Sequence, residues 1–176
     1  MKKIFLVGFC TIMLLCSCGS NSSKEYRPSH FPKHSSAQGY KIPFETHGND
    51  VLVKVRLNGG TQFANAVWDL GCSVPLKISQ YEIGNLMKDA TFKSAAHKAN
   101  AIEVTVANGQ SQTMDLYVLD IVSFTDNDGV EHSVSNVQAV VDPNMSTPIL
   151  IGKPLMDELG YSQEIDNAEN VIIIRE

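Results

Sequence analysis

The sequence lacks several features that define common classes of protein. Among its 176 residues, basic side chains form no cluster beyond Lys2-Lys3, and the net charge is −5. Nucleic-acid binding needs a basic face that displaces counterions from phosphates, so it is not expected. Gly and Pro are not in excess, which argues against a fibrous chain, and the hydrophobic content of 43% argues against a disordered one. This composition fits one globular domain with a tail.

A hydrophobic run long enough to form a permanent transmembrane helix is also missing near the N-terminus. Residues 4–15 are nearly all apolar, but a spanning helix needs about 20 residues. A short apolar run after Lys2-Lys3 has the pattern of an export signal. The sequence therefore predicts a signal peptide over residues 1–17.

The end of this segment resembles the lipobox of bacterial lipoproteins. It has Leu15, two small residues and then Cys18. The resemblance implies that Cys18 is acylated after cleavage and anchors the chain in a lipid membrane. Gly19 favours the outer membrane, so the expected location is the cell envelope, facing the periplasm or the exterior.

Cysteine becomes scarce once the signal is removed. Cys10 and Cys16 leave with it and Cys18 is acylated, so Cys72 is the one thiol left in the expected domain. An internal disulfide is then excluded, and stability must come from an apolar core. Without Lys2 and Lys3 the chain carries 12 basic and 19 acidic residues, a net charge of −7, which favours solubility.

Residues 18–41 show no apolar periodicity. They are rich in Ser, Asn, Pro and His, which predicts a lipidated flexible tether. His30 and His34 stand at helical spacing, but Pro32 lies between them and no acidic or Cys partner is near. We interpret both as solvated linker residues.

Strand patterns dominate residues 42–176. Polar and apolar residues alternate up to Leu57 and again from Ile102 to Val106. These runs end at Asn58-Gly59 and Asn108-Gly109, which are typical of tight hairpins. Other strand-like runs cover residues 62–68, 114–124, 134–141, 148–152 and 171–174.

Helical signals are few. Ser79 can cap a helix that extends to Met87, with Glu82 three residues after the cap. A second short helix is expected over residues 154–159, with Pro154 in its first turn and Gly160 at its end. The prediction is an all-β domain, a closed barrel with one or two short helices.

Metal-binding patterns are absent. Asp126-Asn127-Asp128-Gly129 is similar to the start of a calcium loop, but position 12 of such a loop is Val137 instead of Glu, so we expect a hairpin turn. The three domain histidines have no metal spacing and are expected on the surface: His47, His97 and His132. No metal or organic cofactor is expected.

One turn carries residues suited to chemistry. Asp69 ends an apolar strand, where an acid is rare unless it is paired or functional, and Gly71 follows two residues later. A glycine there lets the backbone turn sharply, and its amide can donate to the carboxylate. Trp68, just before the acid, is expected in the core. Ser73 has no His and Asp partners in an order that suggests a triad.

The order of motifs from residue 42 to 176 resembles that of the single-domain, retropepsin-like aspartic peptidases. Asp69-Leu70-Gly71-Cys72-Ser73 is similar to the family's Asp-Thr-Gly-Ala-Ser, and it follows the early hairpin at Leu57-Asn58-Gly59. Val106-Ala107-Asn108-Gly109 is similar to the flap hairpin. Ile149-Leu150-Ile151-Gly152 is similar to the hydrophobic-hydrophobic-Gly motif behind the active loop. The resemblance implies a closed acid-protease-like barrel.

The resemblance also implies a mechanism and a set of site residues. Two aspartates share one proton, one activates a water, and the other polarises the peptide carbonyl of a peptide or protein substrate. Asp69 is the one Asp-x-Gly aspartate in the sequence, so a homodimer must supply the second. By the same resemblance, residues 70–73 form the active loop, Asn108 and Gly109 the flap, and Ile151 and Gly152 the support behind the loop.

Leu70 departs from the family pattern. The family has Thr or Ser there, whose hydroxyl bonds across the dimer beneath the aspartates, and Leu70 cannot make that bond. An unsatisfied partner amide costs about 1–3 kcal/mol. Cys72, beside a carboxylate, is expected to be a small buried residue and a poor thiolate. Two hypotheses stay open: an active aspartic endopeptidase, and a non-catalytic lipoprotein that binds peptide or protein ligands.

Overall fold

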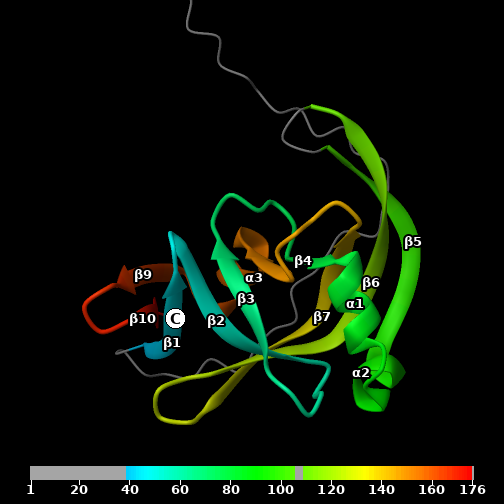
Figure 1. Ribbon diagram of the computed structural model, residues 1–176. Coiled ribbons are helices and arrows are strands. Elements are labelled where there is room, and N and C mark those ends of the chain that lie inside the picture. The colour runs from blue at the N-terminus through cyan, green and yellow to red at the C-terminus, as the bar shows by residue number, and fades with distance from the viewer. Residues whose placement is uncertain (1–38, 106–108, 176) are drawn as a thin grey trace, which may run out of the picture.

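The computed structural model describes residues 39–105 and 109–175, and within these ranges the chain is mostly strand (Figure 1). The strands are β1 (Tyr40–His47), β2 (Asp50–Leu57), β3 (Ala64–Asp69), β4 (Leu76–Ser79), β5 (Ala96–Thr105), β6 (Ser111–Thr125), β7 (Glu131–Asp142), β8 (Ile149–Gly152), β9 (Ser162–Asp166) and β10 (Val171–Arg175). The helices are α1 (Gln80–Leu86), α2 (Ala90–Ala95) and α3 (Lys153–Leu159).

Six of these strands close a barrel. Hydrogen-bonded neighbours follow the order β6-β7-β4-β8-β3-β2, and β2 pairs with β6 to complete the circle. Two pairs are parallel, β3 with β8 and β4 with β7, and the other four are antiparallel. The all-β closed barrel with short helices that the sequence predicts is confirmed.

The barrel interior is an apolar core. Alternating residues of β2 point inward, and Val53 and Val55 are completely buried. Trp68 is also buried, with its ring edge toward Phe124 at a centroid distance of 6.1 Å, so the expectation of a core tryptophan is confirmed. Asp69 thus follows a tightly packed strand.

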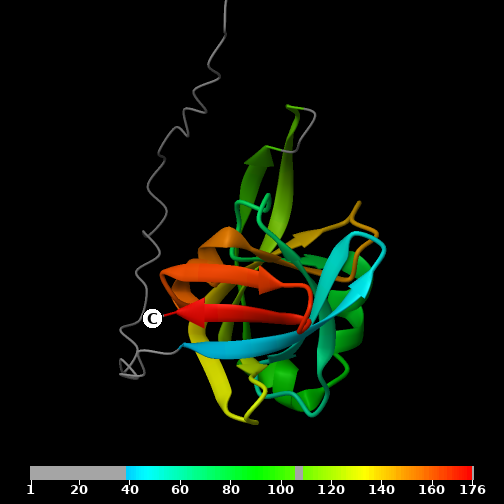
Figure 2. The same cartoon turned by 90° about the vertical axis from the view of Figure 1, so that its left-hand side faces the viewer.

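A second group of strands extends the sheet beyond the barrel. β1 pairs with both β2 and β10, and β10 pairs with β9. Figure 2 shows β1, β10 and β9 on one side of the molecule. β1 begins at Tyr40, two residues before the start that the sequence predicts.

β5 and β6 form a long antiparallel arm that rises beyond the barrel (Figure 1). Inside it, Met114 and Leu116 pack with Val140 of β7 in an apolar cluster separate from the barrel core. Half-buried residues of the arm and of the loop after β3 cover this cluster: Val74, Ala99, Ile102 and Val104. The cluster connects the arm to that loop.

Two helices form where the sequence predicts them. Ser79 caps α1 by accepting the amide of Glu82 at 3.1 Å, and α3 carries its proline in the first turn and ends before Gly160. α2 was not expected. Its cap is Asp89, which accepts the amides of Thr91 and Phe92, and the burial of Phe92 holds the helix in place.

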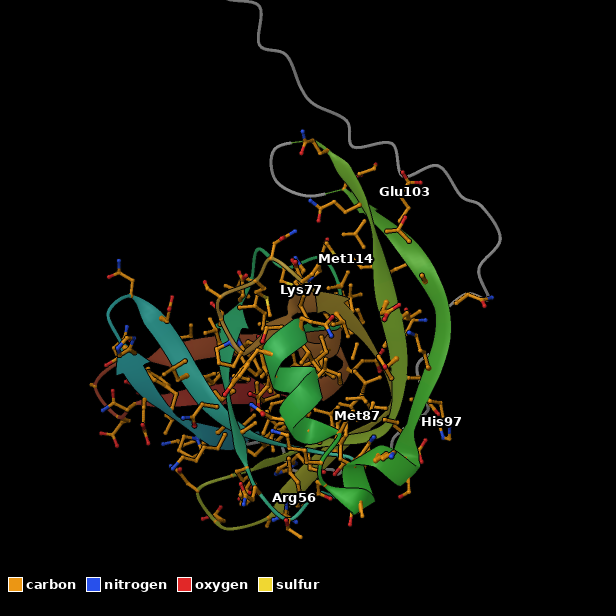
Figure 3. The ribbon with its side chains drawn as sticks, turned by 45° about the vertical axis from the view of Figure 1, so that its right-hand side comes forward. Arg56, Lys77, Met87, His97, Glu103 and Met114 are labelled. Carbon is orange, nitrogen blue, oxygen red and sulfur yellow. The ribbon has the colours of Figure 1, made fainter. Side chains whose placement is uncertain are left out.

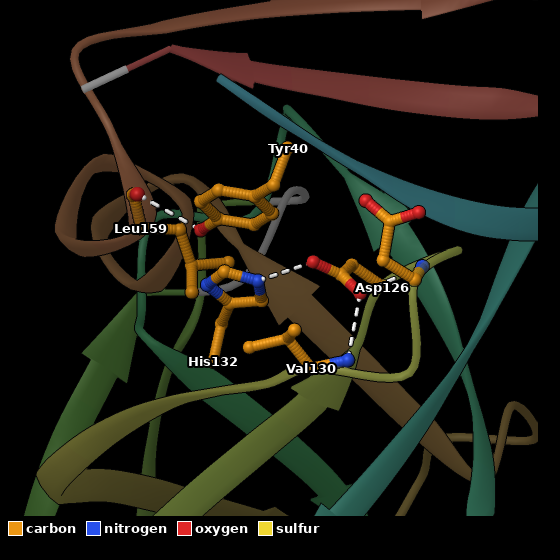
Figure 4. Close-up of polar contacts among 6 residues, drawn as sticks. Tyr40, Asp126, Val130, His132 and Leu159 are labelled. Atoms are coloured by element: carbon orange, nitrogen blue, oxygen red, sulfur yellow. Dashed lines mark hydrogen bonds and ion pairs between the residues drawn. The ribbon is translucent and has the colours of Figure 1, made fainter. Parts of the chain in front are cut away.

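Two expectations are wrong. Asn58 and Gly59 both have positive φ, as predicted, but they open a longer connection, because the first residue of β3 that pairs with β2 is Ala64. His132 is not a surface residue. It stacks on Tyr40 and binds Asp126 in a largely buried cluster (Figure 4). Ring stacking from a strand distant in sequence causes this burial.

Candidate active site

Asp69 stands at the end of β3, where the chain turns sharply. The amide of Gly71 donates to Asp69 Oδ1 at 2.8 Å, and the amide of Cys72 donates to the Asp69 carbonyl at 3.1 Å. The side chain is partly exposed. The first bond fixes the carboxylate at the start of the loop and leaves Oδ2 available to a ligand, and the second closes the backbone turn.

Gly152 supports the loop from behind. It pairs with Asp69 across the parallel β3–β8 contact, and a Cβ atom at this position would lie 1.9 Å from the Val74 carbonyl oxygen. On either side of it, the Gly152 amide donates to the Pro75 carbonyl and the Lys153 amide to the Cys72 carbonyl, both at 3.0 Å. The structure therefore brings Asp69 and Gly152 together, with buried Ile151 beside them.

Leu70 points into solvent, with 61% of its surface exposed. Ser73 is exposed in the same loop.

The Cys72 side chain is half-buried, and its Sγ lies 3.5 Å from the Val74 carbonyl oxygen. Burial raises the pKa of the Cys72 thiol, and the charge of Asp69 raises it further, whereas Lys77 acts in the opposite direction. The thiol is therefore a weak nucleophile, as the sequence predicts.

An ion pair near the loop was missed by the sequence analysis. Lys77 Nζ lies 2.7 Å from Asp142 Oδ2, and the two side chains are 19% and 9% exposed. Burial opposes ionisation of Asp142, but the hydrogen bonds from Lys77 and the Asn144 amide hold its pKa below the usual range. The one sequence signal for this ion pair was Lys77 itself, a charged residue between the apolar residues Leu76 and Ile78 of β4.

Several predicted residues lie outside the described ranges: Cys18, the signal and tether over residues 1–38, and Asn108 of the flap. Gly109, which is described, has a φ of 81°, a value that suits a tight turn. The described residues contain no group of three or more His, Cys, Asp or Glu side chains that could hold a metal ion. No helix within them is long and apolar enough to cross a membrane.

A scan against protein-family models found no match, and a search of curated proteins found no similar sequence. Among solved structures, the chain is similar to a retropepsin-like aspartic protease from Rickettsia conorii. The identity is 15%, the TM-score is 0.47, and the alignment covers 76% of this chain and 86% of the other.

Proposed function

We propose that the protein is an aspartic endopeptidase in which Asp69 activates the attacking water. The observation that carries this proposal is the Asp69 loop, in which the Gly71 amide fixes the carboxylate and Gly152 closely supports the loop from behind. The loop carbonyls leave no room for a side chain at Gly152, so the loop is packed more tightly than an ordinary surface turn needs to be. No metal or organic cofactor takes part.

The chemistry needs two carboxylates. The ionised aspartate accepts a proton from water, and the resulting hydroxide adds to the peptide carbonyl carbon. The protonated aspartate donates to the carbonyl oxygen, and the C–N bond breaks as the leaving nitrogen gains a proton. Each chain supplies one Asp69, so the active form is a homodimer whose partner subunit brings the second.

A dimer fits the side of the molecule that Figure 2 shows. β1, β10 and β9 lie there, and the loop after β3 lies at the top of the barrel in Figure 1. Leu70 exposes 61% of its surface on that loop, and within the described residues β9 pairs with β10 alone, which leaves one strand edge open. A free strand edge is a template for pairing with a second chain, so it favours self-association.

We also propose that Cys18 is acylated after removal of residues 1–17. The tether then holds the domain at a membrane of the cell envelope, where its substrates are peptides or proteins. The arm formed by β5 and β6, with its turn at Gly109, covers the bound substrate and excludes water.

A non-catalytic binding protein is the second candidate, and Leu70 is the observation that favours it. Its side chain has no hydroxyl to bond across a dimer beneath the two aspartates. Such a protein keeps the Asp69 loop and the β5–β6 arm and binds peptides without cleaving them.

One experiment separates the two functions. The full chain is incubated with a mixed peptide library between pH 4 and 7, in parallel with the Asp69→Asn and Asp50→Asn variants. If the protein is a peptidase, the wild type and Asp50→Asn cleave peptides and Asp69→Asn does not. Asp50 is the control because it is an exposed aspartate in the β1–β2 hairpin. Absence of cleavage by a folded, dimeric wild type would leave the binding protein.

A further inference from the structure

The register of the barrel strands places the Lys77–Asp142 pair on the same face of the sheet as Asp69. Directly paired residues, and residues two apart on one strand, share a face. The pairs Val67 with Leu150, Leu150 with Lys77, and Lys77 with Val140 lead from the strand of Asp69 to that of Asp142. One strand, β8, separates Lys77 from the strand that carries Asp69.

Burial supports this assignment. The alternate residues of the same strands point into the barrel core, as Trp68, Ile151 and Leu76 do. Val140 and its partner Leu116 belong instead to the separate apolar cluster inside the arm. Figure 3 shows Lys77 and Met114 on the inner side of the arm, above Arg56.

The ion pair is part of a longer polar network. The Asn144 amide donates to Asp142 Oδ1 at 2.8 Å, and its side-chain nitrogen donates to Gln112 Oε1 at 3.3 Å. Gln112 shares its side of the arm with Met114, two residues on. The otherwise apolar face that Asp69 shares thus contains one polar corner: Lys77, Gln112, Asp142 and Asn144.

This corner has unused bonding capacity. Within the described residues the Lys77 ammonium bonds Asp142 alone, which leaves donors free, and the Asp142 carboxylate can accept further bonds. A ligand carboxylate here would face Asp142, and a ligand ammonium would face Lys77. An aliphatic group would strip water from the pair without replacing its bonds. A side-chain amide accepts from Lys77 and donates to Asp142 at once.

We propose that this polar corner is a substrate subsite that selects Asn or Gln in the peptide bound next to Asp69. The inference rests on the proposed function only in that a peptide lies along this face; it does not require cleavage. Lys77 and Asp142 are then specificity-determining residues.

The test measures binding by the full chain carrying Asp69→Asn. Fluorescein-labelled octapeptides of Ala and Val carry Gln, Glu, Lys or Leu at each position in turn, and anisotropy gives each Kd. At one position we expect Gln to bind about tenfold more tightly than the other three, because a site built for hydrogen bonds rejects side chains that cannot complete them.

Asp142→Asn, which is nearly isosteric, provides the sharpest variant. It removes the negative charge beside Lys77, so the Glu peptide should gain about tenfold at that position, enough to cancel the preference for Gln over Glu. A role of Asp142 in stability alone predicts weaker binding of all four peptides with their order unchanged.

The variant Lys77→Met/Asp142→Leu removes the corner and should make Leu the preferred residue. Lys54→Met/Glu45→Leu is the matched control, because it removes an exposed pair 3.6 Å apart on the β1–β2 hairpin and should keep the Gln preference.

Absence of a Gln preference, its persistence in the corner variants, or no peptide binding at all would overturn the inference. Failure of the peptidase proposal appears separately, as absence of cleavage by wild type.

Discussion

The imidazole of His132 lies flat on the ring of Tyr40, with 3.5 Å between the ring centroids, and its Nε2 is 2.8 Å from Asp126 Oδ2. The Tyr40 hydroxyl donates to the Leu159 carbonyl at 2.9 Å (Figure 4). Asp126 Oδ1 accepts the amides of Asp128 and Val130. This cluster ties the first described strand to the β6–β7 turn and to the end of α3.

Acid should loosen this cluster. Burial opposes the charge of Asp126, but bonds from His132 and the turn amides hold its pKa below the usual range. A carboxyl with a lowered pKa stabilises the fold above its unfolded pKa of about 3.9, and the contribution is lost as pH falls through the folded pKa. Asp126→Asn should therefore cost about 2 kcal/mol at pH 7 and much less at pH 2, measured by urea unfolding.

Asp128→Asn in the same turn is the control, because its side chain is exposed. We expect its unfolding free energy to stay within about 0.5 kcal/mol of wild type at both pH values. An equal loss at pH 7 and pH 2 for Asp126→Asn would contradict the role of the carboxylate charge.

Two glycine substitutions should have opposite effects. Gly152→Ala places a methyl group 1.9 Å from the Val74 carbonyl oxygen, and displacement of the loop should cost about 2–4 kcal/mol. Gly84→Ala in α1 meets nothing within 4 Å and should stabilise the protein by up to about 1 kcal/mol. Thermal unfolding followed by circular dichroism measures both, and a neutral Gly152→Ala would show that the loop is not held by close contact.

Leu70→Thr should raise peptide cleavage if the protein is a peptidase. The added hydroxyl can bond across the dimer, and one such bond of about 1.4 kcal/mol corresponds to about tenfold in kcat/KM. Val130→Thr adds a hydroxyl to another exposed residue, far along the sequence, and should leave kcat/KM unchanged. An equal response of both variants would mean that Leu70 does not limit activity.

Cys72 should react slowly with iodoacetamide in the folded protein. Burial and the charge of Asp69 raise the pKa of its thiol, so little thiolate is present at pH 8. Asp69→Asn removes the nearby negative charge and should speed alkylation several-fold, whereas Asp50→Asn should not. Peptide mass spectrometry separates Cys72 from the other cysteines, and equal rates in the two variants would exclude coupling between Asp69 and Cys72.

Local signals made much of the architecture predictable. Alternation of polar and apolar residues located most strands, Ser79 and Pro154 marked two helix starts, and Asp69 with Gly71 marked the turn that carries chemistry. These features depend on neighbours within a few residues, which the sequence displays directly. The sequence did not predict α2, because Asp89 and Phe92 are stabilised by their tertiary surroundings.

Contacts between distant segments could not be predicted in this way. Three contacts join residues more than 60 positions apart: the ion pair of Lys77 with Asp142, the stacking of His132 on Tyr40, and the close approach of Gly152 to the Val74 carbonyl. The bond between Asp126 and His132 is local by comparison.

The sequence by itself determined an all-β domain with a single Asp-x-Gly turn and a leucine beside its aspartate. Only the tertiary structure decided which residues share a face with Asp69, because that depends on strand register: a shift by one residue would move Lys77 from this face into the core.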